Sequence, residues 1–276
     1  TAYKWFGRTR GGIAMATVMA CAGFAAICGS NNATAATMTT VALPEMKKYR
    51  YDSALSAGSI ACGSTLGVVI PPSVVLIVYG IQTGQSIGKL FWGSTLPGLL
   101  MAFLFVLTIY VLCAKNPHWG PAGPRVRWIN KVKALPGMSE MILLFGLVMG
   151  GLYSGAYTPT EAGAAGAFFA FVIAIAIRRK LSWKGFVSAV LDALKVTSMV
   201  IVIVWGAVLF GRFLTISRLP FQAVELVSNL HIPPPLVIGA ILVIYGIAGM
   251  VMDALGFLLI SIPIFFPIAT QLGYDP

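Results

Sequence analysis

Charged residues are scarce in this 276-residue chain: they make up 10% of it, and Asp and Glu together number only 8. A soluble domain of this size carries about 25% charged residues, so the composition excludes a soluble globular fold. Hydrophobic residues account for 58% of the chain, and the mean hydropathy is +0.89. The composition therefore predicts an all-α polytopic membrane protein, because long apolar runs cross bilayers as helices.

Histidine and cysteine are also rare, with 2 and 4 residues. His118 and His231 are isolated in loops, and no Ser/His/Asp constellation is apparent. Residues 84–90 resemble a phosphate-binding loop only loosely, because three residues separate the glycines where four are needed. We therefore expect neither enzyme activity nor a cofactor. The four cysteines lie in apolar segments and are expected to be small buried residues, not disulfides or zinc ligands: Cys21, Cys28, Cys62 and Cys113.

Acidic residues are too few to balance the basic ones, which leaves a net charge of +11. Such an excess is typical of nucleic-acid-binding proteins. Here, however, the basic residues form short clusters between apolar stretches, which is the pattern of cytoplasmic loops in membrane proteins. We therefore expect no nucleic-acid partner, and we expect the clusters to face the cytoplasm. Fifteen of the 19 basic residues fall in four clusters, at 4–10, 47–50, 115–133 and 178–184.

Long apolar stretches organise the chain. Two of them, 11–43 and 235–272, are too long for one crossing of about 20 residues. Each has a polar or glycine-rich centre, so each is predicted to be a re-entrant hairpin of two half-depth helices. An odd number of crossings between two hairpins makes them open from opposite faces, as in an inverted-topology repeat. Five crossings are predicted: 53–83, 91–114, 139–155, 161–177 and 187–214.

This pattern divides the chain into three regions. Residues 11–90 hold the first hairpin and a broken helix, and are predicted to form part of the first repeat. Residues 91–214 hold further membrane helices and the inter-repeat loop 115–138; the resemblance given below implies that the first region belongs to a transport domain and that the second includes scaffold helices. Residues 235–272 begin the second repeat. Two segments with Trp or Lys beside apolar residues are predicted to be short interfacial helices: 85–91 and 181–186.

Two interruptions of the apolar stretches suggest a binding site. The first is the tip of the first hairpin, where small and polar residues gather: Gly29, Ser30, Asn31, Asn32 and Thr34. The second lies within 53–83, where two prolines would end a soluble helix: Gly63, Ser64, Thr65, Gly67, Pro71, Pro72 and Ser73.

Hard cations prefer oxygen ligands, and broken backbone at membrane depth survives where protein buries it or where it borders a cavity. Both segments are therefore candidate ion or substrate sites, with Ser30, Asn31 and Gly63 as candidate Na⁺ ligands. Two alternatives stay open. Ser and Asn at the tip also suit plain helix caps, and the proline pair also suits a mere kink.

Other polar residues have structural interpretations as well. Asp253 is the only acid of the second hairpin. It either caps the returning half-helix or has an ion-binding or gating role, because intramembrane carboxylates are usually functional. Thr158 and Glu161 have the spacing of a capping box, and Asp192 and Lys195 have that of an ion pair on one helix face.

Taken in order, these motifs resemble the large membrane subunit of tripartite ATP-independent periplasmic (TRAP) transporters, the DctM-like family. The resemblance implies an elevator transporter driven by a sodium gradient, multi-pass in the bacterial inner membrane. It also implies a small membrane subunit with four helices, a periplasmic substrate-binding protein, and organic acids such as C4-dicarboxylates as substrates. The motifs that carry the resemblance are Ala26–Met38, Leu43–Met46, Gly63–Ser73, Ser86–Phe91, Leu96–Gly98 and Thr158–Ala162.

The chain departs from the family pattern at the first tip, which usually reads Ser-Gly-Ser-Ser-x-Ala-Thr. Cys28 replaces the first Ser, and Asn31 replaces the third but keeps an oxygen ligand. The family continues into another broken helix after the second hairpin. We therefore expect this chain to be a fragment, incomplete at both ends, that does not transport alone. The alternative function is another ion-coupled membrane carrier, or a channel, of an unrelated family.

Overall fold

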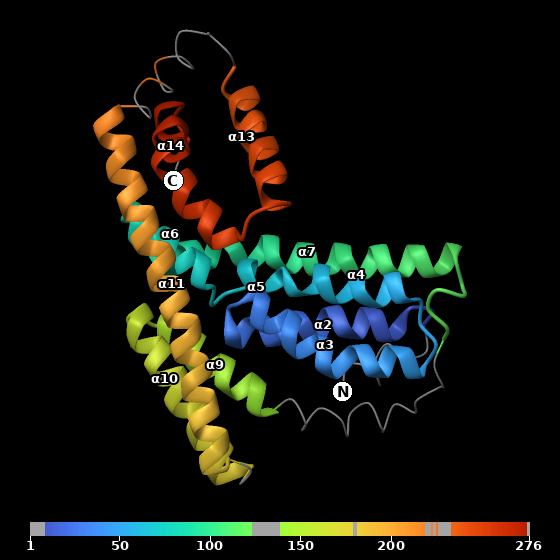
Figure 1. Ribbon diagram of the computed structural model, residues 1–276. Coiled ribbons are helices and arrows are strands. Elements are labelled where there is room, and N and C mark those ends of the chain that lie inside the picture. The colour runs from blue at the N-terminus through green and yellow to red at the C-terminus, as the bar shows by residue number, and fades with distance from the viewer. Residues whose placement is uncertain are drawn as a thin grey trace. The chain divides into compact units, whose positions relative to one another are not determined.

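The computed structural model describes residues 9–122, 139–178, 181–218, 222, 225 and 233–274. Every regular element within these ranges is a helix, which confirms the all-α class for this part of the chain. The chain divides into two compact units. Unit 1 comprises Thr1–Ile77 and Ser86–Arg178, and unit 2 comprises Val78–Gln85 and Arg179–Pro276. Figure 1 labels the helices of both units.

Unit 1 begins with the helical hairpin expected from the sequence. Helices α2 (Gly12–Cys28) and α3 (Asn31–Lys48) pack against each other and are joined by Gly29 and Ser30. α2 ends there because Gly29 takes the left-handed conformation, with φ +60°, that closes the last helical turn. The second arm runs to Lys48, beyond the predicted end at residue 43, with Pro44 inside it. That both arms are re-entrant in a membrane stays a prediction.

The broken helix also forms where the prolines predict it. Helices α4 (Ser53–Ser64) and α5 (Leu66–Val69) are followed by a non-helical stretch, and α6 (Val74–Thr83) resumes after it. Pro71 and Pro72 lie in that stretch and have no N–H to continue the helical hydrogen bonds.

The rest of unit 1 is formed by α7 (Ile87–Lys115), α9 (Ser139–Tyr153), α10 (Pro159–Val172) and the π-helical turn η2 (Ile173–Ile177). The predicted separate helix at 85–91 is wrong, because α7 begins at Ile87 and runs on without a break. Extending a formed helix is easier than nucleating a second one. The predicted capping box at the start of α10 is confirmed, with Thr158 and Glu161 bonded reciprocally.

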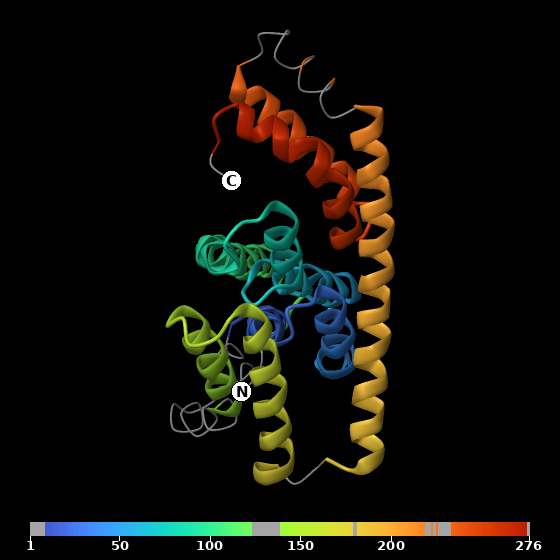
Figure 2. The ribbon, with the colours of Figure 1, turned by 90° about the vertical axis from the view of Figure 1, so that its left-hand side faces the viewer.

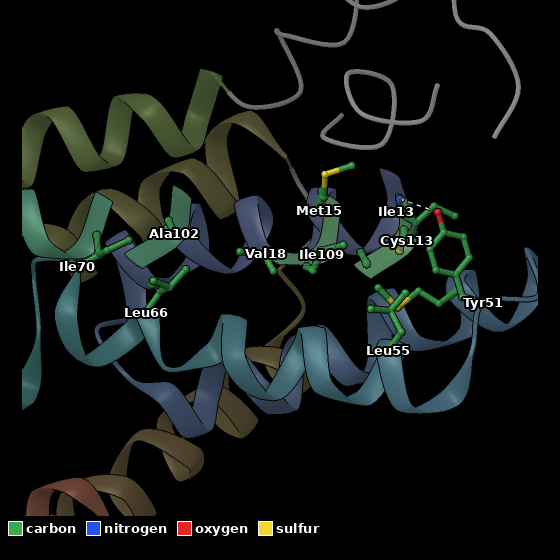
Figure 3. Packing of buried hydrophobic residues seen from close by; sticks show 13 residues of the cluster. Ile13, Met15, Val18, Tyr51, Leu55, Leu66, Ile70, Ala102, Ile109 and Cys113 are labelled. Carbon is green, nitrogen blue, oxygen red and sulfur yellow. Dashed lines mark hydrogen bonds between the residues drawn. The ribbon is translucent and has the colours of Figure 1, made fainter. Parts of the chain in front are cut away.

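Helix α2 packs against α4, α5 and α7, and its side chains form a large part of the main apolar core (Figure 3). Its buried side chains therefore face protein, not lipid. Members of this core include Ile13, Met15, Val18, Leu55, Leu66, Ile70, Ala102, Ile109 and Cys113. All four cysteines are free, as predicted, but only Cys21 and Cys113 are buried; Cys28 is half-buried and Cys62 is exposed.

Tyr51 connects three segments of unit 1 by hydrogen bonds at the end of this core. The Tyr51 hydroxyl accepts a hydrogen bond from the Ile13 N–H and donates one to the Pro121 carbonyl, both at 3.1 Å. Burial raises the pKa of Tyr51 above its ordinary value, so the hydroxyl keeps the proton that it donates. The Gly11 N–H adds a bond to the Gly120 carbonyl at 2.8 Å. The segment after α7 is thereby tied to the starts of α2 and α4.

Unit 2 contains the long helix α11 (Trp183–Ser217) and a second helical hairpin of α13 (Pro234–Gly249) and α14 (Ala254–Gln271). The predicted separate helix at 181–186 is wrong, since α11 already begins at Trp183. The predicted pair of Asp192 and Lys195 is confirmed, with Nζ and Oδ1 3.6 Å apart.

Among the described residues, five helical stretches are long and apolar enough to cross a membrane: Ser53–Thr83 (which includes the break), Ile87–Lys115, Thr160–Ile177, Trp183–Leu214 and Ala254–Gln271. Four of them match predicted crossings. The fifth, α14, is an arm of the second predicted hairpin and is longer than the half-depth helix expected there. The predicted crossing at 139–155 is the shorter helix α9, whose 15 residues rise about 22 Å, less than a bilayer core of about 30 Å. The predicted loop 115–138 lies largely outside the described residues, and the orientation of every loop stays a prediction.

Candidate functional site

The two interruptions that the sequence singles out meet in unit 1. The Gly29 carbonyl at the hairpin tip accepts a hydrogen bond from the Val74 N–H, the first residue after the break, at 3.3 Å. Gly29 also lies so close to the Pro72 carbonyl that a β-carbon there would come within 2.5 Å of that oxygen. The hairpin tip (29–34) and the break in the helix (70–73) therefore form one structural element, although about forty residues separate them in sequence.

A second close approach joins the tip to α5. A β-carbon on Gly67 would lie 2.8 Å from both the carbonyl carbon and the oxygen of Ser30, and 3.0 Å from the Asn31 nitrogen. Glycine is thus required at position 67 by the space available. Gly63 has a different role, because it packs against α2, where a β-carbon would lie 3.0 Å from the Cys21 sulfur.

The polar tip residues act partly as caps. The Ser30 hydroxyl oxygen accepts a bond from the Ala33 N–H at 3.4 Å and caps α3. Thr34 is buried, and its hydroxyl donates to the Ser30 carbonyl at 2.7 Å. The cap interpretation is therefore correct for Ser30. It does not account for Asn32, whose side chain is exposed.

Cys28 takes part in the same cluster, a contact that sequence reasoning did not foresee. Its sulfur lies 3.3 Å from the Thr34 hydroxyl oxygen and 3.6 Å from the Ser30 carbonyl oxygen. The Thr34 hydroxyl and the Cys28 thiol both donate to the Ser30 carbonyl, and the sulfur also contacts the Thr34 hydroxyl. The six-residue separation across a glycine turn was the available signal.

The break supplies backbone oxygens. In a continuous helix the carbonyls of Gly67 and Val68 would accept bonds from residues 71 and 72, which are prolines without an N–H. Among the described residues, no backbone N–H donates to the carbonyls of residues 70–72. These carbonyls therefore also lack a backbone hydrogen-bond donor within the described part of the chain. Ser73 is buried, and its hydroxyl oxygen accepts a bond from the Leu76 N–H at 3.5 Å.

The two remaining hydroxyls near the break are engaged within their own helix. Ser64 donates to the Ala61 carbonyl at 2.8 Å, and Thr65 donates to the Cys62 carbonyl at 2.6 Å. Their oxygen lone pairs are still able to accept. The element as a whole offers neutral oxygens from carbonyls, hydroxyls and two side-chain amides, which is a ligand set for a hard cation.

Beside this element lies an apolar cavity of about 270 Å³, bounded by Ile27, Pro72, Phe91 and by residues of α9 and α10. It has no charged lining residue. Its chemistry suits hydrocarbon, not a carboxylate.

In unit 2, Asp253 caps α14, with its carboxylate accepting a bond from the Leu255 N–H at 3.0 Å. The cap interpretation of this residue is confirmed. The hairpin turn falls within the predicted stretch 249–256, between the end of α13 and Asp253. A role in ion binding or gating, and a position near the first tip, stay predictions.

Comparison with known proteins identifies the family of this chain. The family model of the tripartite ATP-independent periplasmic transporter, DctM component, matches residues 1–276. The chain belongs to that family. It is a family of transporter components, not of enzymes, and together with the apolar helices it makes this a multi-pass membrane protein, as the sequence motifs predicted.

Three relatives give the extent of the similarity. The C4-dicarboxylate TRAP transporter large permease protein DctM of Pseudomonas aeruginosa is 38% identical, over 98% of this chain and 63% of its own length. The protein of the same name in Vibrio cholerae is 34% identical, over 99% and 63%. The isethionate TRAP transporter permease protein DctMQ of Oleidesulfovibrio alaskensis is 34% identical, over 99% and 43%. The chain thus spans less than two thirds of the length of these relatives.

Proposed function

We propose that this chain belongs to the large transmembrane subunit of a secondary, binding-protein-dependent TRAP transporter of the bacterial inner membrane. The transporter imports small organic acids such as C4-dicarboxylates, is driven by a sodium gradient and works by an elevator mechanism. A small four-helix membrane subunit and a periplasmic substrate-binding protein complete it. The family and the names of two similar relatives support the transporter class and the substrate class.

The meeting of tip and break in unit 1 supports sodium as the coupling ion. Its oxygens are neutral, and the described residues contain no group of three or more His, Cys, Asp or Glu that could hold a metal. Fewer charged ligands mean weaker binding of a cation. A neutral oxygen site therefore suits a monovalent ion that must be bound and released in every cycle. Ser30 and Asn31 would contribute side-chain oxygens, and the residues around the proline pair would contribute carbonyls.

The elevator mechanism is supported by the way tip and break are joined. The Gly29–Val74 hydrogen bond and the approach of Gly67 to Ser30 make the two segments one body. An ion held between them would move together with that body and would not need the two segments to separate.

The experiment uses the full-length permease with its small subunit and binding protein in proteoliposomes. An inward sodium gradient should drive uptake of labelled succinate, a C4-dicarboxylate. Ser30→Ala or Asn31→Ala should raise the sodium concentration for half-maximal uptake, whereas Thr40→Ala, an exposed hydroxyl farther along α3, should not. Unchanged sodium dependence in both tip variants would rule out the site.

A channel, or an ion-coupled carrier of another kind, is the competing function. Counterflow separates the first from a carrier, because internal unlabelled succinate accelerates uptake of external label only where binding sites alternate between the two sides. Uptake that follows a proton gradient and ignores sodium would identify another kind of carrier.

A further inference from the structure

Arg212 is a cation in a helix that is otherwise suited to lipid. It lies in α11, within the apolar span Trp183–Leu214. Arg212 lies near the end of this span, and a charged residue within a membrane helix is a candidate functional site. The described residues contain two ion pairs, Arg178–Glu140 and Lys195–Asp192, and Arg212 is in neither. Asp192, the acid of α11, is 20 residues away, which is about 30 Å along the helix axis.

The face of α11 that carries Arg212 is the face that packs against another helix. Ala207, Val208, Gly211 and Arg212 share one side of α11, as their spacing of one and four residues requires. They face Leu259, Ile262 and Pro263 of α14 across a cavity of about 270 Å³.

Contact between the two helices is close at this point. A β-carbon on Gly211 would lie 3.9 Å from the Pro263 ring, and Leu214, one turn farther along the same side, is buried. Figure 2 shows α14 beside α11. Arg212 and Gln82 are themselves exposed, so both side chains are accessible to a solute that enters the cavity.

The cavity has the chemistry of an anion site. Gln82, from the end of α6, lines it together with Arg212. A guanidinium presents paired N–H donors that match the two oxygens of a carboxylate, and a glutamine amide adds further donors. The volume is near the lower end of small-molecule sites, about 300 Å³, so the site suits a small acid.

We propose that Arg212 and Gln82 form a subsite that binds a carboxylate of the transported organic acid. The proposal rests on the proposed function and deepens it, because it assigns the substrate's negative charge to named residues of unit 2. The substrates named for the relatives, C4-dicarboxylates and isethionate, are anions.

The test is counterflow with the full-length transporter and its partners in proteoliposomes. Excess binding protein delivers labelled succinate outside, and the internal succinate concentration is varied. The half-saturating internal concentration then reports on the permease and not on the binding protein. Arg212→Gln should raise it at least tenfold, Arg212→Lys less, and Gln82→Leu severalfold. Lys195→Gln is the matched control, because it removes a cation of the same helix that is already paired.

Each outcome has one meaning. Arg212 and Gln82 variants that reach the membrane and exchange succinate with unchanged half-saturation overturn the subsite. A slower exchange rate with unchanged half-saturation also overturns the subsite. That result is expected if Arg212 only contacts a lipid phosphate or the Leu259 carbonyl. The Leu259 carbonyl has no helical donor, because residue 263 is a proline. Should Arg212→Gln not reach the membrane, Gln82→Leu decides. If the wild-type protein transports no organic acid, the proposed function itself is wrong. This outcome is distinct from a failure of the subsite, which is measured on the variants alone.

Discussion

Replacing Gly67 by alanine tests the joined tip and break most directly. The added methyl would lie 2.8 Å from the carbonyl group of Ser30 and 3.0 Å from the Asn31 nitrogen. Ordinary contacts of this kind are about 3.5 Å or longer, so the tip must retreat from α5 by about half an ångström or more. All three atoms belong to the backbone, and no side-chain rotation relieves the clash.

The expected loss of sodium affinity follows from how little displacement a binding site tolerates. Overpacking of this kind costs about 1–3 kcal/mol, against which alanine gains at most about 1 kcal/mol of helix propensity over glycine. Binding geometry has to hold within about 0.5 Å, so the shift should weaken sodium binding at least tenfold, which corresponds to about 1.4 kcal/mol.

The assay is sodium-dependent succinate uptake by the full-length transporter, with membrane abundance measured beside it. Gly58→Ala is the matched control. Gly58 lies in α4 of the same broken helix, and a β-carbon there meets nothing within 4 Å. The control should keep its sodium dependence. If Gly67→Ala does so as well, at normal abundance, the reasoning from tip and break to an ion site is refuted.

Three further predictions concern the rest of the chain. Tyr51→Phe leaves the buried Ile13 N–H without its acceptor and should lower the free energy of unfolding in detergent by about 1–3 kcal/mol; Tyr110→Phe, an exposed ring, should not. Asp253→Asn keeps an oxygen for the α14 cap, so normal uptake would remove Asp253 from any charge role, and reduced uptake at normal abundance would support one. Single cysteines at 47–50 and 178–186, in a cysteine-free background, should resist an impermeant thiol reagent added outside cells; labelling there would contradict the predicted topology.

The sequence predicted the elements of the site because their causes are local. A proline pair removes two N–H donors wherever it stands, and Gly29 permits the left-handed turn that ends α2. Hairpin, break and both capping motifs were therefore visible in the order of residues. Membrane chemistry made the hairpin tip and the break candidate sites, and the close approaches at Gly29 and Gly67 show that the two segments meet.

Other features depend on packing and were not visible in the sequence. The segments 85–91 and 181–186 lack a helix-breaking residue at their ends, so they join α7 and α11, although their composition alone suggested separate helices. The side of α11 on which Arg212 lies became meaningful only once α14 was seen to pack there.

Position 28 shows why backbone features are the better guide to this site. The family usually has serine where this chain has Cys28, which would remove a ligand if the side chain bound the ion. The thiol instead donates to the Ser30 carbonyl and contacts the Thr34 hydroxyl, which bonds the same carbonyl, so Cys28 acts on the start of α3. A serine could make the same contact. The carbonyls around the proline pair do not change with the side chain at position 28. The proposed site therefore depends most on Gly29, Gly67 and the two prolines, which set where those carbonyls point.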